Sequence, residues 1–164
     1  MDRPVTYFHE EQTFSSWIAW GIVALVGIPV ALASIESLFR SDVFFPSLAT
    51  IATFVPVAIL LFMARLVVDV DRDEIRISFH FLWPTRRIPI AAVRGARAQQ
   101  YSPLAEYGGW GVRLGWRGWA FNTSGSEGVL VETNAGKRVM IGSHRAKELE
   151  AAIARAVAER SEPH

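Results

Sequence analysis

The sequence contains no cysteine, which excludes disulfide bonds, cysteine-based zinc sites and thiol nucleophiles. Lysine is scarce too, with only Lys137 and Lys147 beside fifteen arginines. The net charge of +1 is too small to indicate nucleic-acid binding. The charge is also divided unevenly: residues 1–64 carry two arginines against five acidic residues, so the positive surplus lies in residues 65–164.

Charged residues are missing from two long runs, Trp17–Ile35 and Phe44–Ala64. As helices, runs of nineteen and twenty-one residues would be about 28 Å and about 31 Å long, close to the hydrocarbon thickness of a bilayer. Only residues 36–43 connect them, which favours an antiparallel pair. We therefore predict a transmembrane helical hairpin over residues 17–64. A signal peptide is disfavoured, because the residues before the first run are acidic.

Basic residues set the expected orientation of this hairpin. The connection carries Arg40 alone, whereas Arg65, Arg72 and Arg76 follow the second run. By the positive-inside rule, both termini and the C-terminal domain are expected in the cytoplasm, at a bacterial inner membrane. Residues 1–16 are expected to form an interfacial tail, since aromatic rings settle at headgroup depth. The candidate interfacial anchors are Tyr7, Phe8, Phe14, Trp17 and Trp20.

Residues 65–164 change to a period of two, which predicts half-buried strands. Ile75, Ile77 and Phe79 alternate with polar residues, and residues 134–136 read as a hairpin turn. From Ser143 to about Arg160 the period becomes helical. About seven strands followed by one helix resemble a PH-like (pleckstrin-homology-like) domain. The predicted fold class is therefore an α+β membrane protein, with a PH-like antiparallel β-barrel or sandwich and a C-terminal capping helix behind the hairpin.

Short motifs carry a closer resemblance. They are Glu10-x-Gln12-x-Phe14-x-x-Trp17, Glu106-Tyr-Gly-Gly-Trp-Gly-Val-Arg113, Ala120-Phe-Asn122 and Gly142-Ser143. Together they resemble an uncharacterised bacterial two-span membrane family with a PH-like C-terminal domain. The resemblance covers nearly the whole chain and implies this layout, but it implies no activity.

The glycine-rich segment Gly108–Gly111 has neither the Lys-Ser/Thr of a P-loop nor dinucleotide spacing. It is interpreted either as a tight turn into a strand or as a partner-binding loop. Aromatic residues beside arginine are typical interface anchors, although Trp116 and Trp119 suit core packing equally well. The candidate partner-binding residues are Tyr107, Trp110, Arg113, Trp116 and Trp119.

The densest basic stretch offers a second candidate site. Basic strand residues of PH-like barrels bind lipid headgroups, whereas a solvated basic face beside an anionic membrane gives the same pattern. The candidate lipid-headgroup residues are Arg86, Arg87, Arg94 and Arg97.

Catalytic chemistry is not expected. No pair of the four histidines has a metal-ligand spacing, and the alternating Asp69, Asp71 and Asp73 suit a solvated turn better than a cation site. We expect no catalytic residues, no metal and no cofactor. The predicted function is a non-enzymatic interaction subunit that scaffolds, stabilises or assembles a larger inner-membrane complex. Its expected partners are membrane lipids and other integral membrane subunits, and the alternative is a lipid-headgroup-sensing domain.

Overall fold

The computed structural model of the chain describes residues 5–14, 16–37, 52, 54–56, 58–60, 63–80, 83–115 and 117–161. The chain divides into two compact units. We call residues 1–13 with 65–164 the β body, and residues 14–64 the helical unit. Each unit is described by itself.

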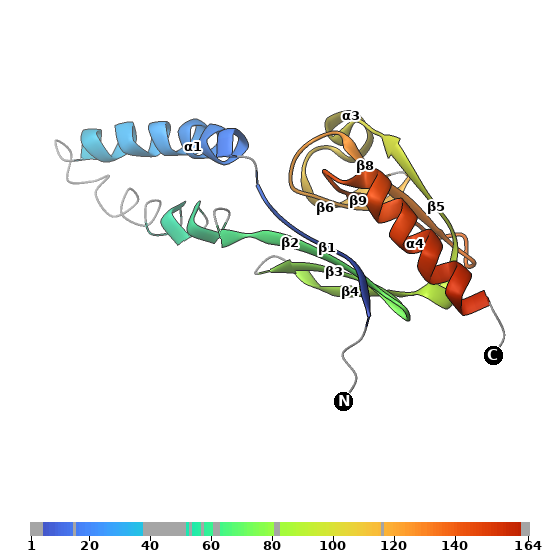
Figure 1. Cartoon of the computed structure of the whole chain (residues 1–164). Helices are drawn as coiled ribbons and strands as arrows, with labels where there is room; N and C mark the ends of the chain where they lie inside the picture. Colours follow the sequence, from blue (N-terminus) through green and yellow to red (C-terminus); the bar gives the residue numbers. More distant parts are fainter. Residues whose placement is uncertain are drawn as a thin grey trace. The chain divides into compact units, whose positions relative to one another are not determined.

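Four antiparallel strands form the first sheet of the β body, in the order β1-β2-β3-β4. Their bounds are β1 Thr6–Thr13, β2 Arg65–Asp71, β3 Glu74–His80 and β4 Trp83–Pro89. Alternation forms this sheet: Leu66, Val68 and Val70 are fully buried, and so are their partners on β3. Figure 1 shows these strands as one layer of the body.

Five strands form the second sheet, in the order β5-β8-β9-β7-β6. The 3₁₀ turn η2 (Ile90–Ala92) leads into it, and α3 (Pro103–Tyr107) follows β5. Strands β7 and β9 run parallel, whereas the sequence predicts antiparallel neighbours only. The difference arises because β6 and β7 are inserted between β5 and β8, so β7 joins the free edge of β9. The bounds are β5 Val93–Gln100, β6 Gly111–Gly115, β7 Gly118–Asn122, β8 Glu127–Thr133 and β9 Arg138–Gly142.

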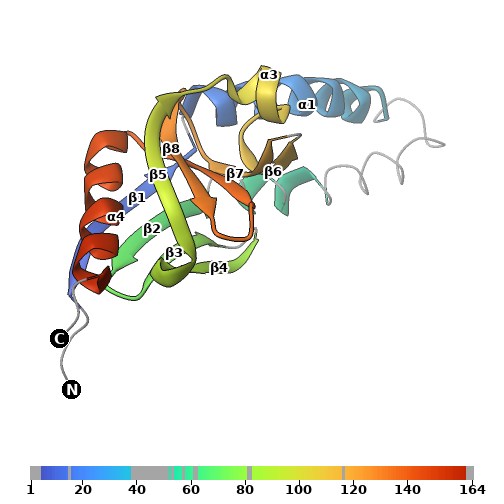
Figure 2. The same cartoon turned by 90° about the vertical axis from the view of Figure 1, so that its right-hand side faces the viewer.

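The predicted C-terminal helix is present as α4 (Ala146–Ser161). Leu149, Ile153 and Ala156 lie on one face, at helical spacing, and are almost fully buried. The helix contacts β1 and β2 of the first sheet and β5 and β8 of the second. Figure 2 shows α4 along the side where β1 and β5 lie. It therefore covers an opening between the two sheets.

The N-terminal tail, for which the sequence predicts an interfacial location, supplies strand β1. Thr13 pairs with Arg65 and His9 with Asp69, so β1 lies antiparallel to β2. Phe8 is buried in the core. The strand is hard to recognise in the sequence because two of its inward positions are Glu10 and Gln12.

The helical unit contains α1 (Ser16–Ser37), and residues 52, 54–56, 58–60 and 63 are also helical. Within the described residues, no helix combines the length and apolarity needed to cross a membrane. The predictions of a transmembrane hairpin, an α+β membrane-protein class and an inner-membrane location are therefore wrong. A long uncharged run does not specify a membrane span, because a helix covered by other protein has the same composition.

Apolar side chains remain exposed on the helical unit. Leu25 is 77% exposed and Trp20 is 63% exposed. Further exposed apolar residues are Val26, Ile28, Leu32 and Ile35 on α1, and Val55, Ile59, Leu60 and Met63 beyond it. Large exposed apolar surfaces usually mark interaction sites.

Candidate functional site

The parallel pairing of β7 and β9 brings two distant turns together. Both strands begin at the same end of the sheet, with Trp119 opposite Val139. The turn before β7 carries Arg117 and Gly118, and the turn before β9 carries residues 136–138. Basic residues twenty positions apart in the sequence therefore lie side by side.

Two glycines make this approach possible. Gly118 has a φ of 113°, and a Cβ atom there would lie 2.3 Å from the backbone oxygen of Arg138. Gly136 has a φ of 74° and donates its N–H to the Thr133 oxygen at 2.9 Å, closing the β8–β9 turn. The geometry of the site thus depends on backbone conformations that other residues rarely adopt.

Strand β4 contributes a cation from the opposite sheet. Arg86 pairs with the buried Ile77, so it faces inward, whereas its neighbour Arg87 faces outward. The Arg86 guanidinium carbon lies 5.7 Å from the Trp119 ring centroid and 5.8 Å from that of Phe121. Both distances are within the range of cation–π attraction. Burial lowers the pKa of the Arg86 guanidinium from its ordinary value.

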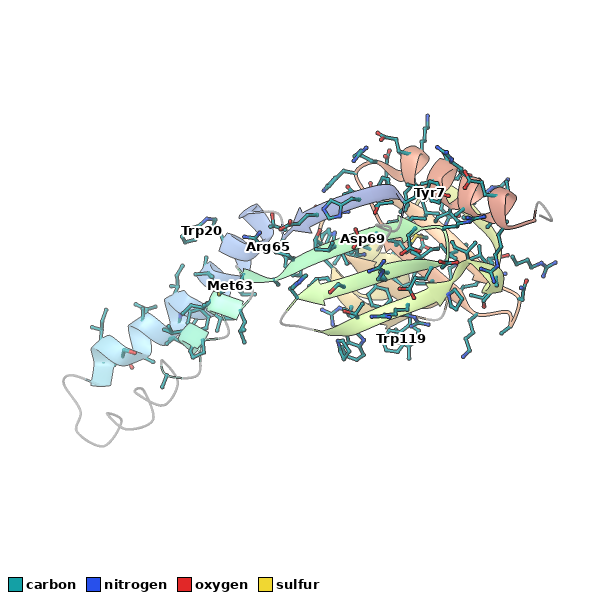
Figure 3. The ribbon with its side chains drawn as sticks, turned by 60° about the horizontal axis from the view of Figure 1, so that its bottom comes forward. Tyr7, Trp20, Met63, Arg65, Asp69 and Trp119 are labelled. Atoms are coloured by element: carbon teal, nitrogen blue, oxygen red, sulfur yellow. The ribbon has the colours of Figure 1, made fainter. Side chains whose placement is uncertain are left out.

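These residues surround a cavity of about 700 Å³. We call it the Arg86–Trp119 pocket; its lining is Arg86, Arg117, Gly118, Trp119, Gly136, Lys137 and Arg138. Figure 3 labels Trp119 at this edge of the body. The Trp83 ring lies 5.6 Å from that of Trp119 and extends the aromatic surface. Four cations beside aromatic rings can bind an anionic group, and Trp and Arg are typical interface anchors.

A second polar cluster lies where β1 meets the start of α4. The Glu10 carboxylate accepts hydrogen bonds from the Ser143 hydroxyl and, at 3.0 Å, from the His144 backbone N–H. Gln12 donates to the Gly142 oxygen and accepts from the Thr123 hydroxyl, both at 3.0 Å. Glu10, Gln12, Thr123 and Ser143 are all buried. The cluster therefore attaches the N-terminal strand to the rest of the body.

The other polar contacts of the described residues link pairs of side chains. Ser124 Oγ lies 3.0 Å from His144 Nε2. No set of three His, Asp or Glu residues suited to a metal occurs in the described part of the chain. The aspartates near β2 serve other contacts: Asp69 pairs with His9, Asp71 with Arg76, and Asp73 with Arg160.

The predicted partner-binding residues separate into different environments. Tyr107 is buried and packs edge-on against Tyr101, at 5.9 Å between ring centroids. Trp110 donates its indole N–H to the Gly125 oxygen at 3.2 Å, and Arg113 donates to the Trp110 oxygen at 3.1 Å. Among the described members of this set, Trp119 is the one that lines the pocket. Trp116 lies outside the described residues.

The predicted lipid-headgroup residues do not gather in one place. Arg86 lines the pocket, and Arg87 lies 3.8 Å from Glu74 on the outer face. Arg94 and Arg97 are exposed on β5, in the other sheet. Of the interfacial anchors, Tyr7 and Phe8 belong to β1, Phe14 follows it, and Trp20 is exposed on α1. The Trp17 side chain lies outside the described residues.

Sequence reasoning missed Arg117, Lys137 and Arg138 as site residues. Each stands within two positions of a turn glycine, Gly118 or Gly136. This repeated pairing of a basic residue with a turn glycine is the signal that could have identified them.

Comparison with known proteins supplies a family but no activity. No curated protein matches the chain. Residues 14–160 match a family described as "Family of unknown function (DUF6141)". This match extends from the start of the helical unit almost to the end of α4, so the chain belongs to the DUF6141 family.

Proposed function

We propose that this protein is a non-enzymatic interaction subunit, which binds a partner protein at the Arg86–Trp119 pocket and so assembles it into a larger complex. The observation that carries this proposal is the half-buried Arg86 stacked on Trp119, with Lys137 beside it. Tryptophan and arginine in a partly desolvated recess are the residues that contribute most to binding energy at protein interfaces.

The fold and the helical unit support the same function. The order of elements is consistent with the resemblance to PH-like domains. A four-stranded sheet is followed by β5, β8, β9 and the C-terminal helix, and α3, β6 and β7 form an insertion between β5 and β8. Fold likeness alone assigns no ligand. The exposed apolar residues of the helical unit, such as Leu25 and Ile28, offer a second surface for contact with other subunits.

Site-specific photo-crosslinking in the source organism tests this function. A photoreactive residue at position 137 points into solvent at the pocket, and one at position 94 is an exposed control on β5. We expect a discrete protein adduct from position 137 and none of that mass from position 94. The substitution Arg86→Gln should reduce the adduct at position 137. Identical adducts from both positions, or adducts with lipid instead of protein at position 137, would contradict the proposal.

A further inference from the structure

The charges of the Arg86–Trp119 pocket are only partly neutralised by the protein itself. Arg117 lies 2.9 Å from Glu106, and Arg138 lies 2.9 Å from Glu132. Arg86 and Lys137 have no carboxylate partner in the part of the chain that the structure describes. The lining therefore carries two uncompensated positive charges.

Arg86 is partly buried, so the lack of a carboxylate partner costs free energy. Its guanidinium lies against the Trp119 and Phe121 rings on the inward side of β4, and its side chain is only half-exposed. Stacking leaves the edge of the guanidinium plane to donate hydrogen bonds. A cation that is partly removed from water and unpaired is unfavourable, and a bound anion relieves that cost.

Carboxylates already bind to cations of the Arg86–Trp119 pocket within the protein itself. Glu106 and Glu132 engage two of the four cations at ordinary hydrogen-bond distances. The Trp119 ring lies against Arg86, and the half-exposed Trp83 ring next to Trp119 extends the apolar surface. A ligand that matches both features carries at least two carboxylates with apolar groups between them. An acidic peptide segment has this chemistry.

We propose that the Arg86–Trp119 pocket binds an acidic segment of the partner protein, with one carboxylate on Arg86 and another on Lys137. This inference rests on the proposed function and adds the chemistry that the partner must present. An inward charge on an edge strand also prevents pairing with other chains, but that role requires neither Lys137 nor Trp119.

The inference is tested by measuring the affinity of the full chain for fluorescently labelled decaglutamate, with fluorescence anisotropy at low salt as the readout. Arg86→Gln and Lys137→Gln should each weaken binding about tenfold, because each removes a charge-assisted hydrogen bond. The second variant alters an exposed side chain and therefore serves where the first fails to fold. Arg94→Gln is the matched control, since it removes the same charge from an exposed site on β5. It should change the affinity less than about twofold, because long-range attraction is screened by salt.

Three results would overturn the inference. The first is an equal loss of affinity in Arg94→Gln and Lys137→Gln, which would mean diffuse charge attraction. The second is equal binding of decaglutamine. The third is a Lys137-dependent affinity for inorganic phosphate or phosphatidylserine vesicles without affinity for decaglutamate.

The two proposals fail in different ways. A protein adduct at position 137 without decaglutamate binding would leave the interaction function standing and remove the acidic segment. Pocket-dependent decaglutamate binding without a protein adduct would support the carboxylate site and contradict the interaction function.

Discussion

Glu10 is the buried carboxylate that connects the first strand to the last helix, and its removal should destabilise the β body strongly. Its side chain accepts from the Ser143 hydroxyl and from the His144 backbone N–H at 3.0 Å. Hydrogen bonds to charged groups contribute about 1.5–3 kcal/mol each. Water can replace part of the hydrogen bonding that Glu10→Ala removes. We therefore expect this substitution to lower the free energy of unfolding by about 2–4 kcal/mol.

The neighbouring Glu11 provides the matched control. It lies on the outer face of β1 and pairs at 2.6 Å with Arg65, in a bridge whose side chains are 42% and 58% exposed. An exposed pair of this kind contributes about 0–1 kcal/mol. Urea unfolding of both variants, followed by tryptophan fluorescence, gives the comparison. Losses in Glu10→Ala and Glu11→Ala that agree within about 0.5 kcal/mol would refute the role of Glu10 in attaching β1 to the start of α4.

Three further changes test other contacts. Burial acts to raise the pKa of Asp71, but the Arg76 hydrogen bond and the backbone N–H groups of Glu74 and Asp73 outweigh it, so the pKa is lowered. In urea unfolding, the difference in free energy of unfolding between the original protein and Asp71→Asn should therefore be largest at pH 7 and should shrink below about pH 4. A difference that does not change with pH would contradict this. Gly118→Ala should cost more than about 3 kcal/mol, whereas Gly95→Ala, where a Cβ meets nothing within 4 Å, should change stability by less than about 1 kcal/mol. Burial raises the pKa of Tyr101 to about 12, so its stabilisation is complete below the unfolded value near 10 and is lost as pH rises toward 12. In an ultraviolet titration, Tyr101→Phe should remove the phenol that ionises near pH 12, and a loss of absorbance change near pH 10 instead would contradict this.

Where local periodicity coincides with burial, the sequence was sufficient to predict the element. Leu149, Ile153 and Ala156 recur at helical spacing and are the buried face of α4. Ile75, Ile77 and Phe79 alternate and are the buried face of β3. In both elements apolar burial decides the structure, and apolar burial is visible in the order of residues.

The sequence failed where burial involves polar groups or distant partners. Glu10 and Gln12 point inward because Ser143 and Thr123 meet them, more than a hundred residues further along. Arg86 and Trp119 were singled out for different sites, whereas the fold places them together. Their meeting depends on the parallel β7–β9 pair, and no local pattern distinguishes it from an antiparallel neighbour.

Strand β1 has consequences for how the chain is completed during synthesis. The residues of β1 are synthesised before those of β2, yet His9 pairs with Asp69, sixty residues later, and the Glu10 contacts arrive more than 130 residues later. The helical unit is therefore synthesised while β1 still lacks β2, the strand with which it pairs. A nascent chain that ends before Ser143 presents Glu10 without its hydrogen-bond donors, so the contacts of the first strand are complete only once the start of the last helix has been made.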